Sequence, residues 1–285
     1  MNYLSNANLG QASATIFCVF QDETDSYKKF CNEDQKAAIT KILASFPDGT
    51  QLGKIHVQNL VSAFDHQTII FLGLGSYQSY SLKVVRNASQ ALGKYLIGTK
   101  YENVQIILPS ISAESDYLLL RQSIIALEAA NIRRDEFKTV PDIQYWPKSI
   151  TFIGNYSEAE KGLKEGDAIA AGIKITKKLA NLPANKCTPS FIGQQAIALA
   201  QDQKKLTVDI YDKKAITELK MGCILGVSQG SAEPPCFIVM NYQGGSNEQA
   251  PIVLIGKGVT FDSGGMCLKT ADSMMSMKYD MCGAA

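Results

Sequence analysis

Histidine is scarce in this sequence, and its scarcity excludes whole classes of catalytic site. Only two histidines occur, His56 and His66, and both lie in the first quarter of the 285 residues. A zinc site with histidine ligands or a Ser-His-Asp triad therefore cannot be built from the C-terminal half of this chain.

Paired cysteine motifs are also missing. The seven cysteines are an odd number at scattered positions, and no Cys-x-x-Cys pair occurs among them. This usage indicates free, buried thiols in a reducing compartment, so the sequence predicts a cytoplasmic protein.

Long apolar runs and blocks of charge are absent as well. No segment approaches the ~18 apolar residues that a membrane-spanning helix needs. The first ten residues lack the basic patch and apolar core of a signal peptide. The net charge is +1 and the lysine pairs are isolated. We therefore expect no membrane partner, and a nucleic-acid partner is disfavoured.

The first 150 residues contain an alternation of strand-like and helix-like segments. Runs rich in β-branched and aromatic residues alternate with segments of helical spacing, and Asn32 is a plausible helix N-cap. The expected strands are 14–20, 68–72, 104–108 and 150–153, and the expected helices are 33–46, 79–95 and 117–130. This order favours an α/β fold with a largely parallel sheet and helices on its faces.

Two glycines, Gly73 and Gly75, stand where a strand could meet a helix. Phosphate-binding loops occur at such junctions, but the third glycine is missing and no lysine follows closely. A plain tight turn is the favoured interpretation, and a nucleotide-binding loop is the alternative.

A long helix is expected over residues 157–181. Two glutamates lie in its first turn and two lysines near its last, as the helix dipole favours, and Pro183 ends it. We interpret this helix as the link between two domains. A helix over 189–200 and strands over 207–211, 236–242 and 252–255 then indicate that a second α/β domain begins.

Four charged residues stand among glycines near the C-terminal end: Lys257, Asp262, Lys269 and Asp280. The strand expected at 252–255 would deliver Lys257 to the carboxyl end of a sheet, where ligands bind in open α/β folds. The aspartates are hard oxygen donors suited to divalent cations. From spacing alone, solvated surface charges are the commoner outcome, so both interpretations stay open.

Lysine needs a special reason to stand in a metal site. It coordinates only as the neutral amine, and burial beside a cation would lower its pKa enough for that. A second lysine that stays charged could polarise a carbonyl oxygen or stabilise a developing oxyanion.

Three colinear stretches resemble a known family. They are LANLPANKCTPSFIGQQA over 179–196, SQGSAEPPCFIVMNYQGG over 228–245, and GKGVTFDSGGMCLK followed by MKYDMCGAA within 256–285. In these stretches the chain resembles the leucyl aminopeptidase (cytosol aminopeptidase) family of dinuclear metallo-exopeptidases. The resemblance is strong from about residue 157 onward and weak before it.

The resemblance implies an N-terminal macrodomain-like α/β domain over residues 1–155, a linker helix over 156–182, and a catalytic domain over 183–285. The catalytic domain would have a mixed central sheet and be incomplete in this chain. The resemblance also implies a cytoplasmic homo-hexamer that releases N-terminal leucine and other apolar residues from peptides. Its cofactors would be two divalent metal ions, manganese or zinc foremost, and a bicarbonate in the complete site.

The resemblance also implies roles for five residues. Lys257 and Asp280 would ligate one metal, and Asp262 would bridge both. Lys269 would be the catalytic lysine that polarises the scissile carbonyl. Met277 would line the pocket for the N-terminal side chain, so all five would belong to the substrate-binding site. The nucleophile would be a water that bridges the metals.

The sequence departs from the family pattern in two ways. Met266 and Cys267 replace an aliphatic and a small residue after the double glycine, which leaves the lysine position untouched. The next family motif, which supplies an Asp and a Glu to the metals and an Arg that holds bicarbonate, is not found in this chain. We therefore expect the isolated 285-residue chain to be inactive and poorly stable. The alternative is a non-catalytic fragment, or a DNA- or partner-binding regulator of the same family.

Overall fold

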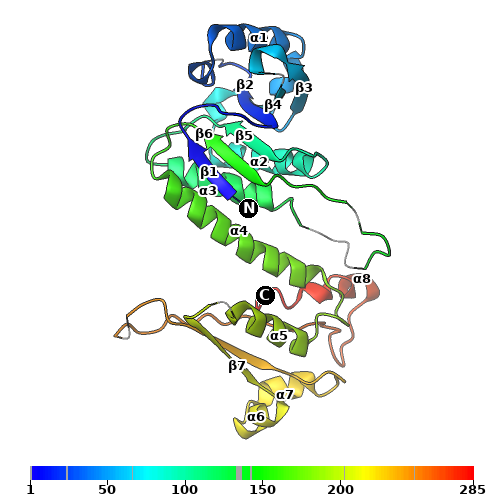
Figure 1. Cartoon of the computed structure of the whole chain (residues 1–285). Coiled ribbons are helices and arrows are strands. Elements are labelled where there is room, and N and C mark those ends of the chain that lie inside the picture. Colours follow the sequence, from blue (N-terminus) through cyan, green and yellow to red (C-terminus); the bar gives the residue numbers. More distant parts are fainter. Residues whose placement is uncertain are drawn as a thin grey trace. The chain divides into compact units, whose positions relative to one another are not determined.

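The computed structural model describes residues 2–23, 25–65, 67–132, 137–141, 143–201, 203–246 and 248–285, so His66 lies outside the described residues. The chain divides into two compact units, residues 1–174 and 175–285 (Figure 1).

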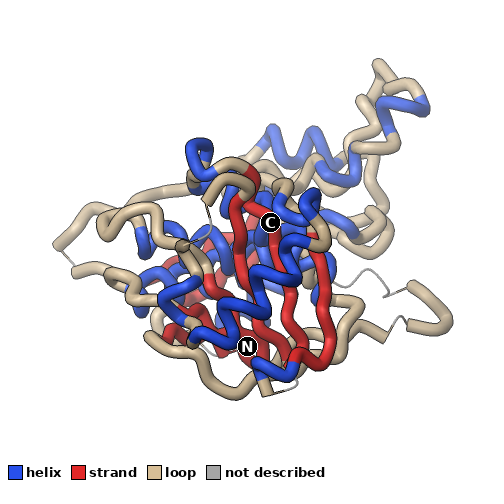
Figure 2. The backbone as a smooth tube through the Cα atoms, turned by 90° about the horizontal axis from the view of Figure 1, so that it is seen from above, coloured by secondary structure: helices blue, strands red, loops and turns tan. Residues whose placement is uncertain are grey.

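A six-stranded sheet forms the centre of the first unit. Its strands are β1 (Asn2–Asn6), β2 (Ala14–Phe20), β3 (Ile55–Val61), β4 (Gln67–Gly75), β5 (Asn103–Ile107) and β6 (Ser149–Ile153). Their spatial order is β1-β6-β5-β2-β4-β3, and every neighbouring pair is parallel except β3 with β4. Figure 2 shows these strands side by side in red. The predicted α/β class is confirmed, and the single antiparallel strand makes the sheet mixed.

Helices cover both faces of this sheet. They are α1 (Glu33–Ala44), α2 (Leu82–Leu96), α3 (Asp116–Glu128) and the first part of α4 (Ala159–Asn181). Alternate residues of β2 point to opposite faces: Ile16 packs in the cluster that contains α2 and α3, and Phe17 packs in the cluster that contains Ile39 of α1. Because both faces are covered, all seven residues of β2 are buried.

Local sequence signals explain where α1 begins. The Asn32 side chain accepts a hydrogen bond from the Gln35 backbone N–H at 2.9 Å, and the Gln35 side chain accepts one from the Asn32 N–H at 3.0 Å. This reciprocal capping box confirms the N-cap predicted from the sequence.

The paired glycines at the end of β4 have a packing role. A Cβ on Gly73 would lie 2.1 Å from the carbonyl oxygen of Gln51, so only glycine fits beside that backbone. Gly75 ends the strand with φ of 76°, in the left-handed region. Helix α2 begins only at Leu82, so these glycines do not lead straight into a helix as a phosphate loop does.

Small residues let α4 approach α3 closely. Gly162, Gly166 and Ala170 follow one another at four-residue intervals and share one face of the helix. A Cβ on Gly162 would lie 2.5 Å from the carbonyl oxygen of Tyr117, and one on Gly166 would lie 3.1 Å from the Cα atom of Arg121. Backbone contact therefore sets the packing of these two helices.

The second unit is built around a two-stranded antiparallel sheet. Its elements are α5 (Pro189–Ala200), β7 (Leu206–Tyr211), α6 (Lys213–Glu218), α7 (Gly222–Ser228), β8 (Phe237–Tyr242) and α8 (Ala271–Met274). β7 pairs with β8, and α5 contacts both strands. A small core joins α4, α5 and the last residues of the chain: Leu179, Leu182, Cys187, Ile192 and Met281.

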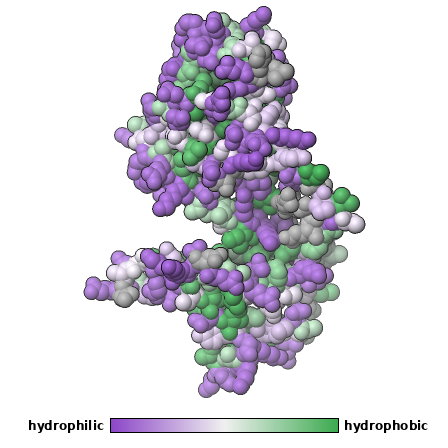
Figure 3. Space-filling model, in the orientation of Figure 1, coloured by the Kyte–Doolittle hydropathy of each residue, from purple (hydrophilic) through white to green (hydrophobic). Residues whose placement is uncertain are grey.

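The strand predicted at 252–255 is wrong. The backbone of this segment pairs with no described strand, and its four apolar side chains are 73–93% exposed. An apolar β-branched run becomes a strand only when a neighbouring strand takes up its N–H and C=O groups. Figure 3 shows hydrophobic surface on the second unit.

Helices of membrane-spanning length and hydropathy are not found within the described ranges.

Candidate functional site

Close backbone packing places Lys257. A Cβ on Gly256 would lie 2.1 Å from the carbonyl oxygen of Gly283, and one on Gly283 would lie 3.1 Å from the backbone nitrogen of Lys257. The two glycines thus let the segment around Lys257 run against the last residues of the chain. Lys257 was expected at the carboxyl end of a sheet strand; instead it follows an exposed segment that is neither helix nor strand.

A glycine turn places Asp262 and Lys269. Gly264 and Gly265 have φ of 94° and 76°, a region that residues with a Cβ rarely adopt. Asp262 Oδ1 accepts the Gly264 N–H at 2.8 Å, and the Lys269 N–H donates to the Ser263 carbonyl at 2.9 Å. The loop folds back on itself and brings the two side chains together.

The four charged residues form two ion pairs. Lys269 Nζ lies 2.6 Å from Asp262 Oδ2, and Lys257 Nζ lies 2.8 Å from Asp280 Oδ2. The Asp280 carboxylate raises the pKa of Lys257, with a smaller contribution from the charge of Asp262. The two ion pairs therefore interact electrostatically. The Lys269 ammonium, and next the Gly264 N–H, lower the pKa of Asp262.

Met277 joins this group through its sulfur. It opens the single-turn 3-10 helix η5 (Met277–Tyr279), and Asp280 follows directly. Lys269 Nζ donates to Met277 Sδ at 3.0 Å, so the ammonium of Lys269 lies between a carboxylate and a thioether. Lys269 is less exposed than Lys257, with 27% of its side chain accessible against 60%.

The donor set fits a divalent cation in part. Asp280 Oδ2 is shielded from solvent, and apart from the Lys257 ammonium no donor of the described residues reaches it. A carboxylate oxygen has further lone pairs to offer, so it can take a cation as well. The raised pKa of Lys257 keeps its amine protonated, and a protonated amine cannot coordinate a metal. Within the described ranges, no three His, Cys, Asp or Glu side chains gather as a metal site.

The structure brings together all five site residues predicted from the sequence. Their roles are not tested by this proximity. Two features were not predicted from the sequence: the Gly256–Gly283 contact and the neighbour Lys278, whose ammonium reaches the end of α4. The run of small residues after Met281 could have indicated the Gly256–Gly283 contact. Nothing in the sequence indicated the contact of Lys278 with α4.

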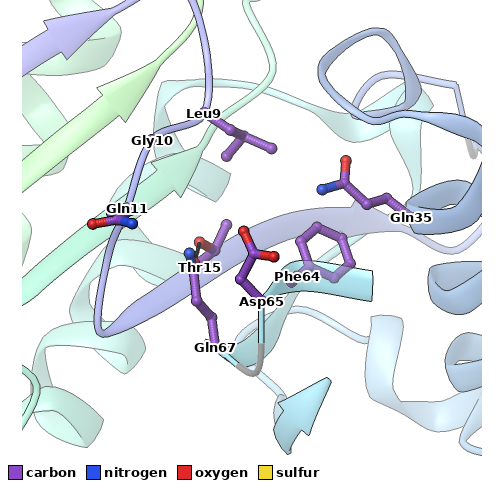
Figure 4. Close-up of a pocket in the computed structure, with 8 residues that line it drawn as sticks. All are labelled: Leu9, Gly10, Gln11, Thr15, Gln35, Phe64, Asp65 and Gln67. Carbon is purple, nitrogen blue, oxygen red and sulfur yellow. Dashed lines mark hydrogen bonds between the residues drawn. The ribbon is translucent and has the colours of Figure 1, made fainter. Parts of the chain in front are cut away.

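A cavity of about 280 Å³ lies in the first unit, apart from this group (Figure 4). It opens at the amino ends of β2 and β4, and its lining residues are Leu9, Gly10, Gln11, Thr15, Gln35, Phe64, Asp65 and Gln67. Asp65 is the one titratable side chain of the described lining, and Thr15 donates to the Gln67 side chain at 3.2 Å. The cavity therefore lacks the paired acid and base groups of a catalytic site.

Comparison with protein families matches both parts of the chain. Residues 16–141 match the model of the N-terminal domain of the cytosol aminopeptidase family, and residues 174–285 match that of its catalytic domain. A probable cytosol aminopeptidase of Paraburkholderia phymatum is 37% identical over 283 residues, which are 96% of this chain and 56% of that protein. One of Burkholderia pseudomallei is 35% identical, with the same coverage. The chain thus spans about half the length of the curated relatives it matches.

Solved structures share the fold. A mutant of tomato leucine aminopeptidase has a TM-score of 0.80 at 22% identity, covering 100% of this chain and 57% of that one. The bottromycin maturation enzyme BotP, in complex with Mn, has a TM-score of 0.72 at 22% identity, covering 96% of this chain and 54% of that one.

Proposed function

The chain belongs to the cytosol aminopeptidase family, and on that premise we propose that the complete protein is a metal-dependent aminopeptidase. It releases N-terminal amino acids, leucine and other apolar residues preferred, from peptide substrates. The observation that carries this proposal is the convergence of Lys257, Asp262, Lys269 and Asp280 on one another, with Asp280 Oδ2 shielded from solvent.

Two divalent ions, manganese or zinc, are the proposed cofactors, with a bicarbonate in the complete site. Asp280 and Lys257 would hold one ion, and Asp262 would be a ligand of both. When bound, the ions would supply Lewis-acid chemistry, which activates a carbonyl group and a water nucleophile for hydrolysis. The BotP structure, which is a complex with Mn, supports a divalent metal for this fold.

Three residues of the chain have specific roles in the proposed reaction. Lys257 would hold an ion only as the neutral amine, whereas Asp280 favours its protonated form. Lys269 stabilises the negative charge that develops on the carbonyl oxygen. Met277, in contact with Lys269, supplies an apolar wall for the substrate's N-terminal side chain.

The organisation proposed for the complete protein follows the family. It has an N-terminal domain over 1–155, a linker helix over 156–182 and a catalytic domain from 183, and it assembles as a cytoplasmic hexamer. The two matched family models, which end at 141 and begin at 174, support this division.

Lys269→Ala in the full-length protein is the test. We expect kcat on leucine p-nitroanilide to fall about 100- to 1,000-fold, as when one oxyanion donor is lost, while the manganese content after dialysis stays at the wild-type level. Lys213→Ala, at an exposed position of α6, is the matched control. A Lys269→Ala enzyme with wild-type turnover would remove the assigned role, and a wild-type protein without turnover would remove the proposed function.

A further inference from the structure

Helix α4 ends beside the proposed site, and a lysine from far along the chain covers its end. The last carbonyl groups of a helix lack partners within the helix, and the helix dipole makes this end negative. The carbonyl of Asn181, the last residue of α4, accepts a hydrogen bond from Lys278 Nζ at 3.1 Å. Residues 97 positions apart therefore meet at this helix end.

Lys278 stands between residues that face the proposed site. Met277, just before it, accepts from Lys269, and Asp280, two residues later, pairs with Lys257. The single turn of η5 fixes the directions of these side chains relative to one another. When the Lys278 ammonium is seated on α4, Met277 and Asp280 are held toward Lys269 and Lys257.

Two further contacts hold the same segment on the same helix. Met281 is fully buried in a cluster with Leu179 and Leu182. The Thr176 hydroxyl donates to the Ala285 carbonyl at 3.1 Å. Apolar burial alone lets a short turn rotate or slide, whereas a charge directed at one carbonyl sets its register.

We propose that Lys278 is a positioning residue of the candidate metal site. Its ammonium on the end of α4 determines where Asp280 and Met277 stand, although it does not itself touch substrate or metal. This inference rests on the proposed function, because it assigns to Lys278 a role in presenting Asp280 to the cation.

The test uses the full-length protein with three variants. Lys278→Met keeps the aliphatic stem and removes the charge. Lys278→Arg keeps both charge and reach. Lys214→Met makes the same chemical change at an exposed lysine of α6, whose side chain forms no hydrogen bond or ion pair with another described residue, and is the matched control.

The first measurement is Mn²⁺ affinity by calorimetry. We expect Lys278→Met to weaken it about tenfold, as loss of a residue that orients a metal ligand does. Lys278→Arg should restore it to within about twofold of wild type, and Lys214→Met should leave it unchanged. If Lys278→Met binds Mn²⁺ like wild type, even with a lower melting temperature, the role is structural only and the proposal is wrong.

The second measurement is hydrogen exchange in the metal-free protein. The amides of Tyr279, Asp280 and Cys282 donate within this turn, and we expect them to exchange faster in Lys278→Met than in Lys214→Met. If Lys278→Met does not fold, Lys278→Gln, which keeps a donor without the charge, replaces it in both measurements.

The two proposals fail in different ways. A wild-type protein that neither takes up Mn²⁺ nor cleaves leucine p-nitroanilide overturns the proposed function, and the role in metal presentation falls with it. If the wild-type protein does both but Lys278→Met is unchanged in Mn²⁺ affinity or in amide exchange, only the role of Lys278 is overturned.

Discussion

Glycine conformation shapes the loop that carries Asp262 and Lys269. Gly264 combines a φ of 94° with crowding, because a Cβ there would lie 2.4 Å from the Cys267 carbonyl oxygen. Nothing in the sequence besides the double glycine announces this geometry, yet it decides whether the two charged side chains meet.

Gly264→Ala should therefore destabilise the second unit. We expect a loss of about 1–2 kcal/mol in the free energy of unfolding from the left-handed backbone, with additional cost from the contact at Cys267. Urea unfolding measures it. Gly222→Ala, whose Cβ would meet nothing within 4 Å and whose backbone is helical, is the control. Equal stabilities of the two variants would contradict the prediction.

Burial distinguishes Cys31 from the exposed cysteines. It raises the pKa of the Cys31 thiol from 9.0 to about 11, whereas Cys223 and Cys267 lie at the surface. Because the thiolate is the nucleophile, we expect iodoacetamide at pH 8 to alkylate Cys31 at least ~10-fold more slowly than those two, as measured by peptide mass spectrometry. Comparable rates at all three would contradict this.

The same thiol makes stability depend on alkaline pH. The folded state holds the Cys31 proton more tightly than the unfolded state. The contribution of Cys31 to the free energy of unfolding is therefore fully present below about pH 9 and is lost as the pH rises toward 11. We expect Cys31→Ala to flatten the fall in melting temperature between these values. An equally steep fall in the variant would exclude Cys31 as its source.

At the scale of elements, the sequence predicted segments with strong periodicity and missed those whose pattern is set by their neighbours. The limits of β2 and α5 agree with the structure to the residue. β1 was missed because its sequence, NYLSN, is polar and becomes a strand only by pairing with β6. The segment 252–255 was wrong for the opposite reason, since its apolar run lacks a partner among the described strands.

The candidate site likewise has features that the sequence predicts and features that it does not. The family resemblance predicts which five residues belong to the candidate site, because they lie within a literal motif. Their arrangement could not be predicted, because it depends on contacts distant in sequence, between Gly256 and Gly283 and between Lys278 and Asn181. Such contacts leave no periodic pattern in one sequence.

The packing of α4 on α3 predicts that alanine substitutions at two glycines of α4 have opposite effects on stability. Gly162→Ala should lower the free energy of unfolding by about 1–3 kcal/mol, because the added Cβ would meet the Tyr117 backbone. Gly172→Ala, exposed and with nothing within 4 Å, should stabilise by about 0.5–1 kcal/mol, because alanine favours the helix. Thermal unfolding of both variants measures the difference, and effects of the same sign would refute the packing argument.

At the scale of the whole molecule, one segment has four consecutive apolar residues that are all exposed. Residues 252–255 expose 73–93% of their surface, which is a contiguous patch rather than scattered hydrophobes. The chain of residues 1–285 should therefore self-associate as its concentration rises.

Ile252→Lys with Leu254→Lys should suppress that association, because two charges interrupt the apolar run. Analytical ultracentrifugation measures it. Val227→Lys, at an isolated exposed hydrophobe of α7, is the control and should leave the association unchanged. A monomeric wild-type chain at all concentrations would contradict the prediction.

The pairing of Lys257 with Asp280 and of Lys269 with Asp262 also has a consequence beyond the site. The two ammonium groups and two carboxylates cancel, with the charges of each pair less than 3 Å apart. Opposite charges so close together cast almost no field past a Debye length of about 8–10 Å. These four charges therefore contribute almost nothing to the steering of a peptide toward the metal-free protein, and replacing all four by neutral residues should leave the ionic-strength dependence of the encounter rate unchanged.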